Sequence, residues 1–213
     1  MRTYDDPCGV ARGLNVIGER WALLVVRELL FGPKRFTDLH LGLPTASQNV
    51  LSQRLRELER TGVVRRRRLG PPAATWVYEL TEWGRDLEPL LFQLARWGSR
   101  APMTSGNELS ADALMFALRT RFDATGARDG TYEIRLGDDR FRAEIAGGRL
   151  DLARGAAERP DAVLDTDPPT LRSVVFGGLD LSEAVRQGHL RVNGDERAAA
   201  RFVATFPRPA PVG

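Results

Sequence analysis

Hydrophobic residues recur at helical spacing through the first part of the chain. Leu14, Ile17 and Trp21 are separated by three and four residues. They follow the acidic, proline-containing stretch Asp5-Asp6-Pro7, which is typical of a helix start. The next run, WALLVVRELLFG from Trp21, is apolar over two turns and is stopped by Gly32-Pro33. The pattern predicts a leading helix and then a central buried helix.

A short helix and a longer helix are predicted next, with a glycine and a proline between them. The run RFTDLH favours a short helix that contains Phe36 and Leu39 and ends at Gly42. The longer run, TASQNVLSQRLRELERTG, has Thr45 and Gln48 at capping-box spacing. We therefore expect the longer helix to begin at Thr45 and to be closed by the glycine at its end.

The longer helix has one leucine face and one polar face. Leu51, Leu55 and Leu58 recur at helical spacing. Amide, hydroxyl and arginine side chains occupy or flank the opposite face: Thr45, Asn49, Ser52, Gln53, Arg56 and Arg60. Two helices joined by a glycine-containing turn form the outline of a helix-turn-helix, and such polar groups can read base edges in a major groove. A merely solvated polar face is the alternative interpretation.

Four consecutive arginines, residues 65–68, stand in a run that otherwise has the pattern of a β-strand. VVRRRR and TWVYELT are joined by LGPPAA, which predicts a hairpin directly after the polar helix. Because side chains alternate along a strand, two arginines should face each side. A guanidinium group binds phosphate through a planar fork and can enter a narrow minor groove, so we expect both sets to reach a DNA backbone. A solvated edge strand protected by charge is the alternative.

These segments together resemble the HxlR family of winged helix-turn-helix transcriptional regulators. The resemblance rests on CGVARGLNVIGERWALLVVRELLFGPKRFTDLH, LPTASQNVLSQRLRELERTGVVRR and VYELTEWGRDLEPLL, in that order. It implies a homodimer on a roughly palindromic operator, with the helix from Thr45 in the major groove and the hairpin as the wing. The candidate DNA-binding residues are Thr45, Ser47, Gln48, Asn49, Ser52, Gln53, Arg56, Arg65, Arg66, Arg67 and Arg68.

The resemblance also implies dimerisation through the N-terminal helix and a helix from Glu82 to about Arg100. The apolar residues of the second of these helices are Leu87, Leu90, Leu91, Leu94 and Trp97. Some of them are expected in the intramolecular core instead.

The single cysteine, Cys8, matches the N-terminal cysteine through which several regulators of the HxlR family sense oxidants or electrophiles. At a helix start the helix dipole would favour the thiolate, whereas Asp5 and Asp6 oppose it. The chain has one cysteine, so sensing would require an intersubunit or a mixed disulfide. The other interpretation, which we favour from the sequence, is a small residue packed at a helix start.

The second half begins after a short linker and mixes helices with strands. The stretch APMTSGNELS, residues 101–110, is small, polar and interrupted by proline and glycine, as linkers are. LSADALMFALRTRF predicts an amphipathic helix capped by Ser110. The following segment predicts strands with tight turns at Gly137-Asp138-Asp139 and Gly147-Gly148. The remainder predicts strand, helix, glycine turn, helix, strand and helix.

The last hundred residues resemble the sterol carrier protein family of lipid-binding domains. PDAVLDTD, LRSVVFGGLDLSEAVRQGHLRVNGD and the closing helix carry this resemblance. It implies a mixed sheet packed against helices, with an apolar tunnel for a hydrophobic ligand. The candidate ligand-binding residues are Leu114, Leu118, Phe122, Phe141, Leu171 and Phe176. The same residues are also candidates for the core, because a domain of this size requires an apolar interior.

Composition and charge agree with a two-domain globular protein. The 213 residues are 42% hydrophobic and 28% charged. Residues up to Arg100 hold 16 basic and 11 acidic side chains, and the rest hold 15 and 17, so an anionic partner suits the first half. No apolar run approaches the roughly 18 residues that cross a bilayer, and the start lacks the apolar core of a signal peptide. We therefore expect a cytoplasmic protein with no membrane partner.

Patterns for catalysis and metal binding are weak. His40 and His189 lie far apart in the sequence and have no partner at ligand spacing. A single cysteine excludes a cysteine-rich zinc site and an internal disulfide. The motifs GxSxG, GxxxxGK[ST] and GxGxxG do not occur. We expect no enzyme, no cofactor and no metal.

The sequence thus predicts an α+β protein with two domains. A winged helix-turn-helix DNA-binding and dimerisation domain is expected at residues 1–101, and a mixed-sheet α/β sterol-carrier-like domain at residues 107–207. The predicted function is a transcriptional regulator that binds double-stranded DNA as a homodimer, with a second domain that binds a small hydrophobic effector or supports the dimer. A thiol-based redox-sensing regulator acting through Cys8 and a lipid-binding carrier protein are the alternatives.

Overall fold

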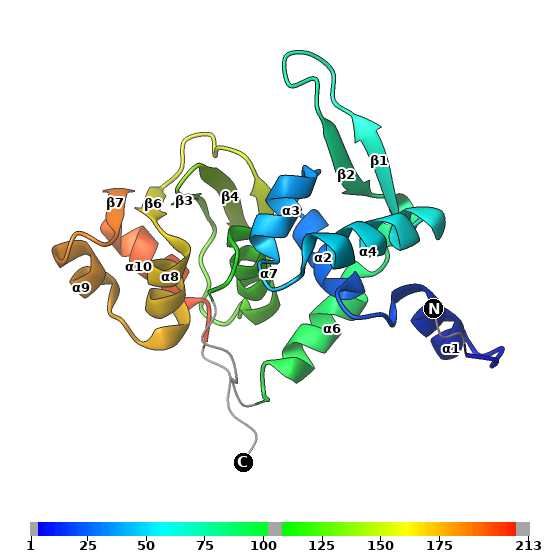
Figure 1. The fold of residues 1–213 in the computed structure, drawn as a ribbon. Coiled ribbons are helices and arrows are strands. Elements are labelled where there is room, and N and C mark those ends of the chain that lie inside the picture. Colours follow the sequence, from blue (N-terminus) through cyan, green and yellow to red (C-terminus); the bar gives the residue numbers. More distant parts are fainter. Residues whose placement is uncertain (1–3, 102–107, 208–213) are drawn as a thin grey trace. The chain divides into compact units, whose positions relative to one another are not determined.

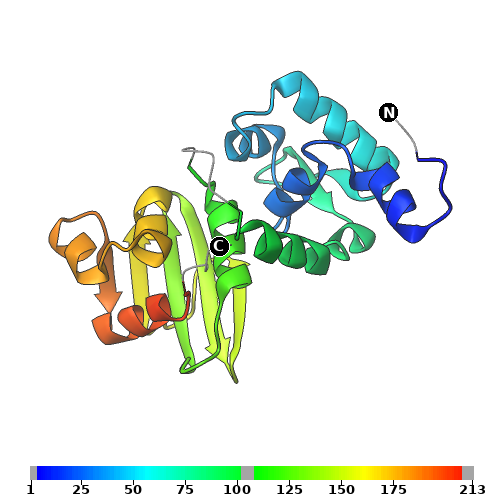
Figure 2. The ribbon, with the colours of Figure 1, turned by 90° about the horizontal axis from the view of Figure 1, so that it is seen from below.

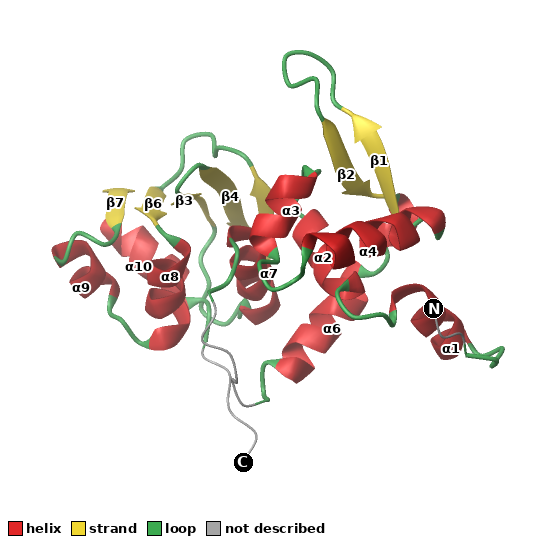
Figure 3. Cartoon of the chain, in the orientation of Figure 1, coloured by secondary structure: helices red, strands yellow, loops and turns green. Residues whose placement is uncertain are grey.

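The computed structural model describes residues 4–101 and 108–207. They form two compact units, which divide between Gln93 and Leu94 (Figure 1). The first unit is mainly helical with one hairpin, and the second combines a sheet with helices, so the chain has the predicted α+β fold (Figure 3). Helix α6 (Glu88–Gly98) begins in the first unit and ends in the second.

The first unit is built around its second helix. The helices before α6 are α1 (Gly9–Ile17), α2 (Ala22–Leu29), α3 (Phe36–Gly42), α4 (Gln48–Arg60) and α5 (Glu82–Arg85). Ala22, Val25 and Val26 of α2 are inaccessible to solvent, and Leu29 is nearly so. The apolar run from Trp21 therefore forms the central buried helix, as predicted, and α3 and α4 pack against it.

The start of α4 differs from the predicted one. The helix begins at Gln48 rather than at Thr45, so the predicted capping box is wrong. Ser47 has the extended backbone of an N-cap, and its hydroxyl oxygen accepts a hydrogen bond from the Val50 N–H at 3.4 Å. Thr45 lies instead in the turn before the helix, where the Ala46 N–H bonds back to the carbonyl two residues before Thr45 at 3.0 Å.

Two further helix boundaries differ from the sequence prediction. Cys8 is the N-cap of α1, so the stretch Asp5-Asp6-Pro7 lies ahead of that helix. The helix predicted from Glu82 onward is broken between α5 and α6. Pro89 explains the break, because proline has no N–H and its ring would clash with the carbonyl of Arg85 in a continuous helix.

The predicted hairpin forms directly after α4. Strands β1 (Val64–Arg68) and β2 (Trp76–Leu80) pair antiparallel, with Val64 opposite Leu80 and Arg68 opposite Trp76. Gly62, at the end of α4, has a φ of +79°, a left-handed conformation that suits glycine. The Thr81 hydroxyl donates to the Gly62 carbonyl at 2.6 Å and ties the two strand ends together at the base of the hairpin.

The second unit contains a mixed five-stranded sheet in the order β5-β4-β3-β6-β7. Its strands are β3 (Gly130–Leu136), β4 (Asp139–Ala146), β5 (Arg149–Arg154), β6 (Ala162–Thr166) and β7 (Arg191–Gly194). Strands β3 and β6 are parallel, and the other pairs are antiparallel. The tight turns predicted between β3, β4 and β5 are present, with positive φ at Gly137, Gly147 and Gly148.

Helices cover one face of this sheet. They are α7 (Ala111–Arg121), α8 (Pro168–Arg172), which continues into a π-helical turn (Ser173–Gly177), α9 (Leu181–Arg186) and α10 (Glu196–Ala204). Figure 2 shows α7 and α10 in front of the strands, and both contact the sheet. Tyr132 of β3 stacks on Phe202 of α10, with ring centroids 4.4 Å apart. The mixed sheet packed against helices that the sterol-carrier resemblance implies is therefore confirmed.

Helix α7 is buried more completely than predicted. Ser110 caps it as expected, by accepting from the Ala113 N–H at 3.0 Å. However, the residues from Ala111 to Phe116 are all buried, so the helix is not amphipathic. Asp112 is among them, and its carboxylate accepts two hydrogen bonds from Arg154 at 2.8 and 2.7 Å. A charge partner from β5 thus allows an acidic residue to lie inside the unit.

Candidate nucleic-acid interface

The polar face of α4 is exposed to solvent. Gln48, Asn49, Gln53 and Arg56 are exposed, and Ser52 is half-buried. The turn residues Thr45 and Ser47 before the helix are exposed as well. The leucines of the opposite face, Leu51, Leu55 and Leu58, are all inside the first unit. The two faces therefore lie as the sequence predicted, while the DNA contacts themselves stay a prediction.

Two of the exposed side chains are partly engaged within the helix. Gln53 donates from its amide to Glu57 at 3.1 Å, and the Nε of Arg56 donates to the Ser52 carbonyl at 3.3 Å. Both contacts are one helical turn long and exposed, so they cost little to exchange for contacts with a ligand. The polar face of α4 is thus ordered and still accessible to a ligand.

Arg54 is a buried charged residue of α4 that the sequence reasoning missed. It lies among the leucines, its side chain is 9% exposed, and it forms ion pairs with Glu57 and, at 3.5 Å, with Glu19. Glu19 belongs to the segment between α1 and α2, so Arg54 holds α4 against that segment. Its position three residues after Leu51, on the apolar stripe, was the available signal.

A buried carboxylate fixes the turn between α2 and α3. Glu28 is fully buried and accepts hydrogen bonds from Arg27 and from the Nζ of Lys34, both at 2.8 Å. The backbone of Lys34 in turn pairs with Tyr78 of β2, through bonds of 2.9 and 2.8 Å. These contacts connect α2 and the segment before α3 to the hairpin.

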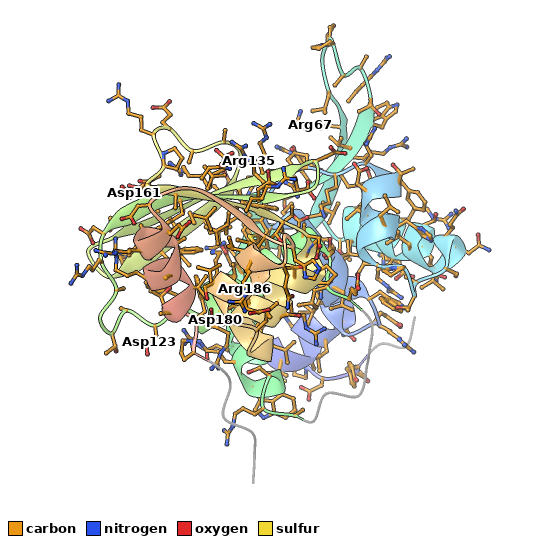
Figure 4. The ribbon with its side chains drawn as sticks, turned by 90° about the vertical axis from the view of Figure 1, so that its left-hand side faces the viewer. Arg67, Asp123, Arg135, Asp161, Asp180 and Arg186 are labelled. Carbon is orange, nitrogen blue, oxygen red and sulfur yellow. The ribbon has the colours of Figure 1, made fainter. Side chains whose placement is uncertain are left out.

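The four arginines of β1 divide into two pairs with different surroundings. Arg65 and Arg67 each donate from Nε to one oxygen of the Glu79 carboxylate, both at 2.7 Å. Arg66 lies on the other face, with its guanidinium carbon 4.6 Å from the Trp76 ring centroid. Figure 4 labels Arg67 on this hairpin. The predicted alternation is present, but one pair already has a carboxylate partner.

Glu79 remains ionised despite its burial. Burial by itself would raise the pKa of its carboxyl group, but hydrogen bonds and charges from Arg67 and Arg65 outweigh it and hold the pKa below the ordinary value. The sequence reasoning missed this residue because only the strand register places it beside two arginines.

The second unit contains a cavity of about 590 Å³. Ala117 and Arg121 of α7, together with Arg172, Ser173 and Phe176 after β6, line it. Of the predicted ligand-binding residues, Phe176 lies at this cavity. Four others have no accessible surface and belong to the core: Leu114, Leu118, Phe141 and Leu171. Phe122 is half-buried, with its ring centroid 6.3 Å from that of Phe206.

Two protein families match the two halves of the chain. Residues 16–105 match the HxlR-like helix-turn-helix family, and residues 118–207 match the SCP-2 sterol transfer family. YvaP, an uncharacterised HTH-type transcriptional regulator of Bacillus subtilis (strain 168), is 36% identical over 88 residues. That match covers 41% of this chain and 82% of YvaP. The chain belongs to the HxlR-like family.

The chain is also similar to a second curated regulator and to a solved structure. YdeP, another uncharacterised HTH-type transcriptional regulator of Bacillus subtilis (strain 168), is 38% identical over 97 residues, which cover 45% of this chain and 74% of YdeP. Among solved structures, the redox regulator HypR in its oxidised form is 36% identical. That match covers 46% of this chain and 100% of HypR, with a TM-score of 0.41. The family matches and the two Bacillus subtilis relatives show that the chain is an HxlR-type helix-turn-helix transcriptional regulator with an SCP-2-like second domain.

Cys8 of this HxlR-type regulator is exposed. Its Sγ accepts a hydrogen bond from the Ala11 N–H at 3.3 Å. Cys8 thus lies at a helix start, as the structural interpretation predicted, but it is at the surface rather than packed.

The two histidines belong to different units, His40 to the first and His189 to the second. His40 of α3 stacks on Phe36, with ring centroids 6.5 Å apart, and His189 is exposed. In residues 4–101 and 108–207, no three His, Cys, Asp or Glu side chains are grouped so that they could hold a metal ion. No helix in those ranges is long and apolar enough to span a membrane.

Proposed function

We propose that this regulator binds a palindromic operator in double-stranded DNA as a homodimer, with α4 in the major groove and the hairpin on the phosphate backbone. The observation that carries the proposal is the exposed amide and hydroxyl face of α4, followed directly by a hairpin with exposed arginines. Amide groups can bind base edges with two hydrogen bonds, whereas guanidinium groups bind phosphates of any sequence. In this proposal α4 recognises the base sequence, and the hairpin supplies sequence-independent attraction to the phosphates.

The test compares one variant of each element. An operator is first selected from random duplexes with the full chain. Gln53→Ala is expected to change the sequence preference, while Arg66→Ala weakens binding to all sequences and reduces the salt slope by about one. Arg197→Ala, exposed on α10 of the second unit, is the matched control and should leave binding unchanged. Equal losses of Gln53→Ala and Arg66→Ala on every duplex would contradict this division.

Exposed apolar side chains on two helices support the homodimer. Leu90, Leu94 and Trp97 lie on α6 at helical spacing, and Trp97 is 74% exposed. Val10 and Leu14 are exposed on α1. Large apolar side chains gathered on helix faces are typical of interaction surfaces. Of the residues predicted for this role, Leu91 is buried and Leu87 half-buried, so both serve the chain itself.

We propose that the second unit binds an effector in the cavity beside Phe176, which Gly98, Ser99 and Ala101 line from the end of α6 onward. The cavity has the size of small-molecule sites, and it is lined by Phe176, Ala117 and Leu109. Hydrophobic metabolites that raise the melting temperature should also change operator affinity. Ala117→Leu, which places a larger side chain at the cavity wall, should weaken both effects. A ligand that binds without changing operator affinity would limit the second domain to supporting the dimer.

A thiol sensor is the second candidate, because the Cys8 thiol is free and exposed to solvent. Its oxidation would join two subunits or attach a small thiol, since the chain has no second cysteine. Treatment with a mild oxidant should then reduce operator binding by the wild-type chain and leave Cys8→Ser unaffected. The same loss in both proteins would exclude the thiol mechanism.

A further inference from the structure

The hairpin contains an internal negative charge. The Glu79 side chain is 6% exposed, while those of Arg65 and Arg67, which it binds, are 63% and 44% exposed. The register accounts for the contact: Arg65 is directly opposite Glu79, and Arg67 follows two residues along the same face of β1. These three ionised groups together carry one positive charge.

The opposite face of the hairpin keeps its full charge. Arg66 stands opposite Tyr78, and its guanidinium lies over the rings of Trp76 and Tyr78, with centroid distances of 4.6 and 6.0 Å. Arg68 stands opposite Trp76. Aromatic rings attract a cation without neutralising it. In the part of the chain that the structure describes, neither Arg66 nor Arg68 takes part in an ion pair.

We propose that Glu79 limits the sequence-independent affinity of the hairpin for DNA, and that Arg66 and Arg68 supply its main phosphate contacts. Glu79 withdraws one unit of positive charge from the hairpin and occupies the Nε donors of the other two arginines. Attraction to the phosphate backbone grows with the number of cations presented, and it carries no sequence information. A protein that must find one operator among many other sites discriminates better when its sequence-independent affinity for DNA is low.

This inference rests on the proposed function, and it predicts a gain on mutation. Glu79→Gln removes the charge and keeps the shape of the side chain. Binding of the full chain to a scrambled duplex should tighten by about eightfold at 0.1 M salt, and the salt slope should steepen by about 0.9, the value for one added phosphate contact. Glu79→Asp, which keeps the charge, should remain close to the wild type. A merely structural role for Glu79 would produce a loss in both variants.

Arginine variants test the same inference without changing Glu79. In the wild-type background, Arg66→Ala should weaken binding more than Arg65→Ala, whereas in the Glu79→Gln background the two losses should become equal. This comparison holds even if Glu79→Gln fails to fold, because its first half needs only the wild-type carboxylate.

Weaker or unchanged binding of a folded Glu79→Gln chain would overturn the inference, as would equal losses for Arg65→Ala and Arg66→Ala in the wild type. If the wild-type chain itself binds selected and scrambled duplexes equally, the proposed function fails instead. The two failures are therefore distinguishable.

Discussion

Gly42, the last residue of α3, packs directly against the buried carboxylate of Glu28. A Cβ at this position would lie 2.3 Å from Oε2 and 2.8 Å from Cδ of Glu28. The same Oε2 accepts the hydrogen bond from Lys34 at 2.8 Å, so the carboxylate cannot move without losing that partner. Gly42→Ala therefore places a methyl group where a clamped, fully buried side chain already stands.

Two opposing effects decide the outcome. Alanine in a helix is favoured over glycine by roughly 0.5–1 kcal/mol. Overpacking a tight interior costs about 1–3 kcal/mol, and weakening a hydrogen bond between charged groups costs about 1.5–3 kcal/mol. The steric and electrostatic cost is the larger, so we expect Gly42→Ala to lower the free energy of unfolding by about 2 kcal/mol.

Urea unfolding followed by tryptophan fluorescence measures this change. All four tryptophans lie between residues 21 and 97, so the signal reports mainly on the first unit. Gly13→Ala is the matched control, because Gly13 lies inside α1 and an added Cβ meets nothing within 4 Å. That variant should be as stable as the wild type or slightly more stable. If the free energy of unfolding of Gly42→Ala equals or exceeds that of the wild type, the Glu28 side chain does not oppose a Cβ at this position and the reasoning is refuted.

Three further predictions concern the dimer, a buried ion pair and pH. Leu94→Asp, which places a charge in the exposed apolar stripe of α6, should shift the chain to a monomer in sedimentation equilibrium; an unchanged mass would exclude that stripe as the interface. Arg154→Ala removes the ion pair that Asp112 forms with Arg154 and should lower the free energy of unfolding by about 3–5 kcal/mol in calorimetry, whereas a loss under about 1 kcal/mol would contradict a stabilising buried pair. Burial raises the pKa of Glu133, but hydrogen bonds, foremost that from Arg135, outweigh it and hold the pKa below the ordinary 4.5. The stabilisation that goes with this lowered pKa is present above pH 4.5 and is lost as the pH falls through the folded-state pKa. The free energy of unfolding of Glu133→Gln should therefore decrease less steeply with falling pH in the acid range than that of the wild type.

The spacing of hydrophobic residues was sufficient to predict α4 and the hairpin of the candidate interface. The spacing of Leu51, Leu55 and Leu58 determines which side of α4 is buried, because a helix repeats every 3.6 residues whatever it packs against. The strand-like run that contains Arg66 likewise implied a hairpin and its alternation of side chains. Cap choice was less certain from the sequence, since Thr45 and Ser47 can both cap a helix and only the turn geometry selects Ser47.

The sequence by itself determined the order of helices and strands, the two faces of α4 and the basic character of the hairpin, because these depend on residues close together in the chain. The tertiary structure decided which charged side chains are paired within the chain and which remain available to a ligand. Glu79 is one acidic residue among many until the register of β1 and β2 places it between two arginines, and Arg54 and Asp112 are buried charges only because Glu19 and Arg154 come to them from other elements. Pairing of charges depends on distances between segments far apart in the sequence, and those distances are set by packing and strand register rather than by local pattern.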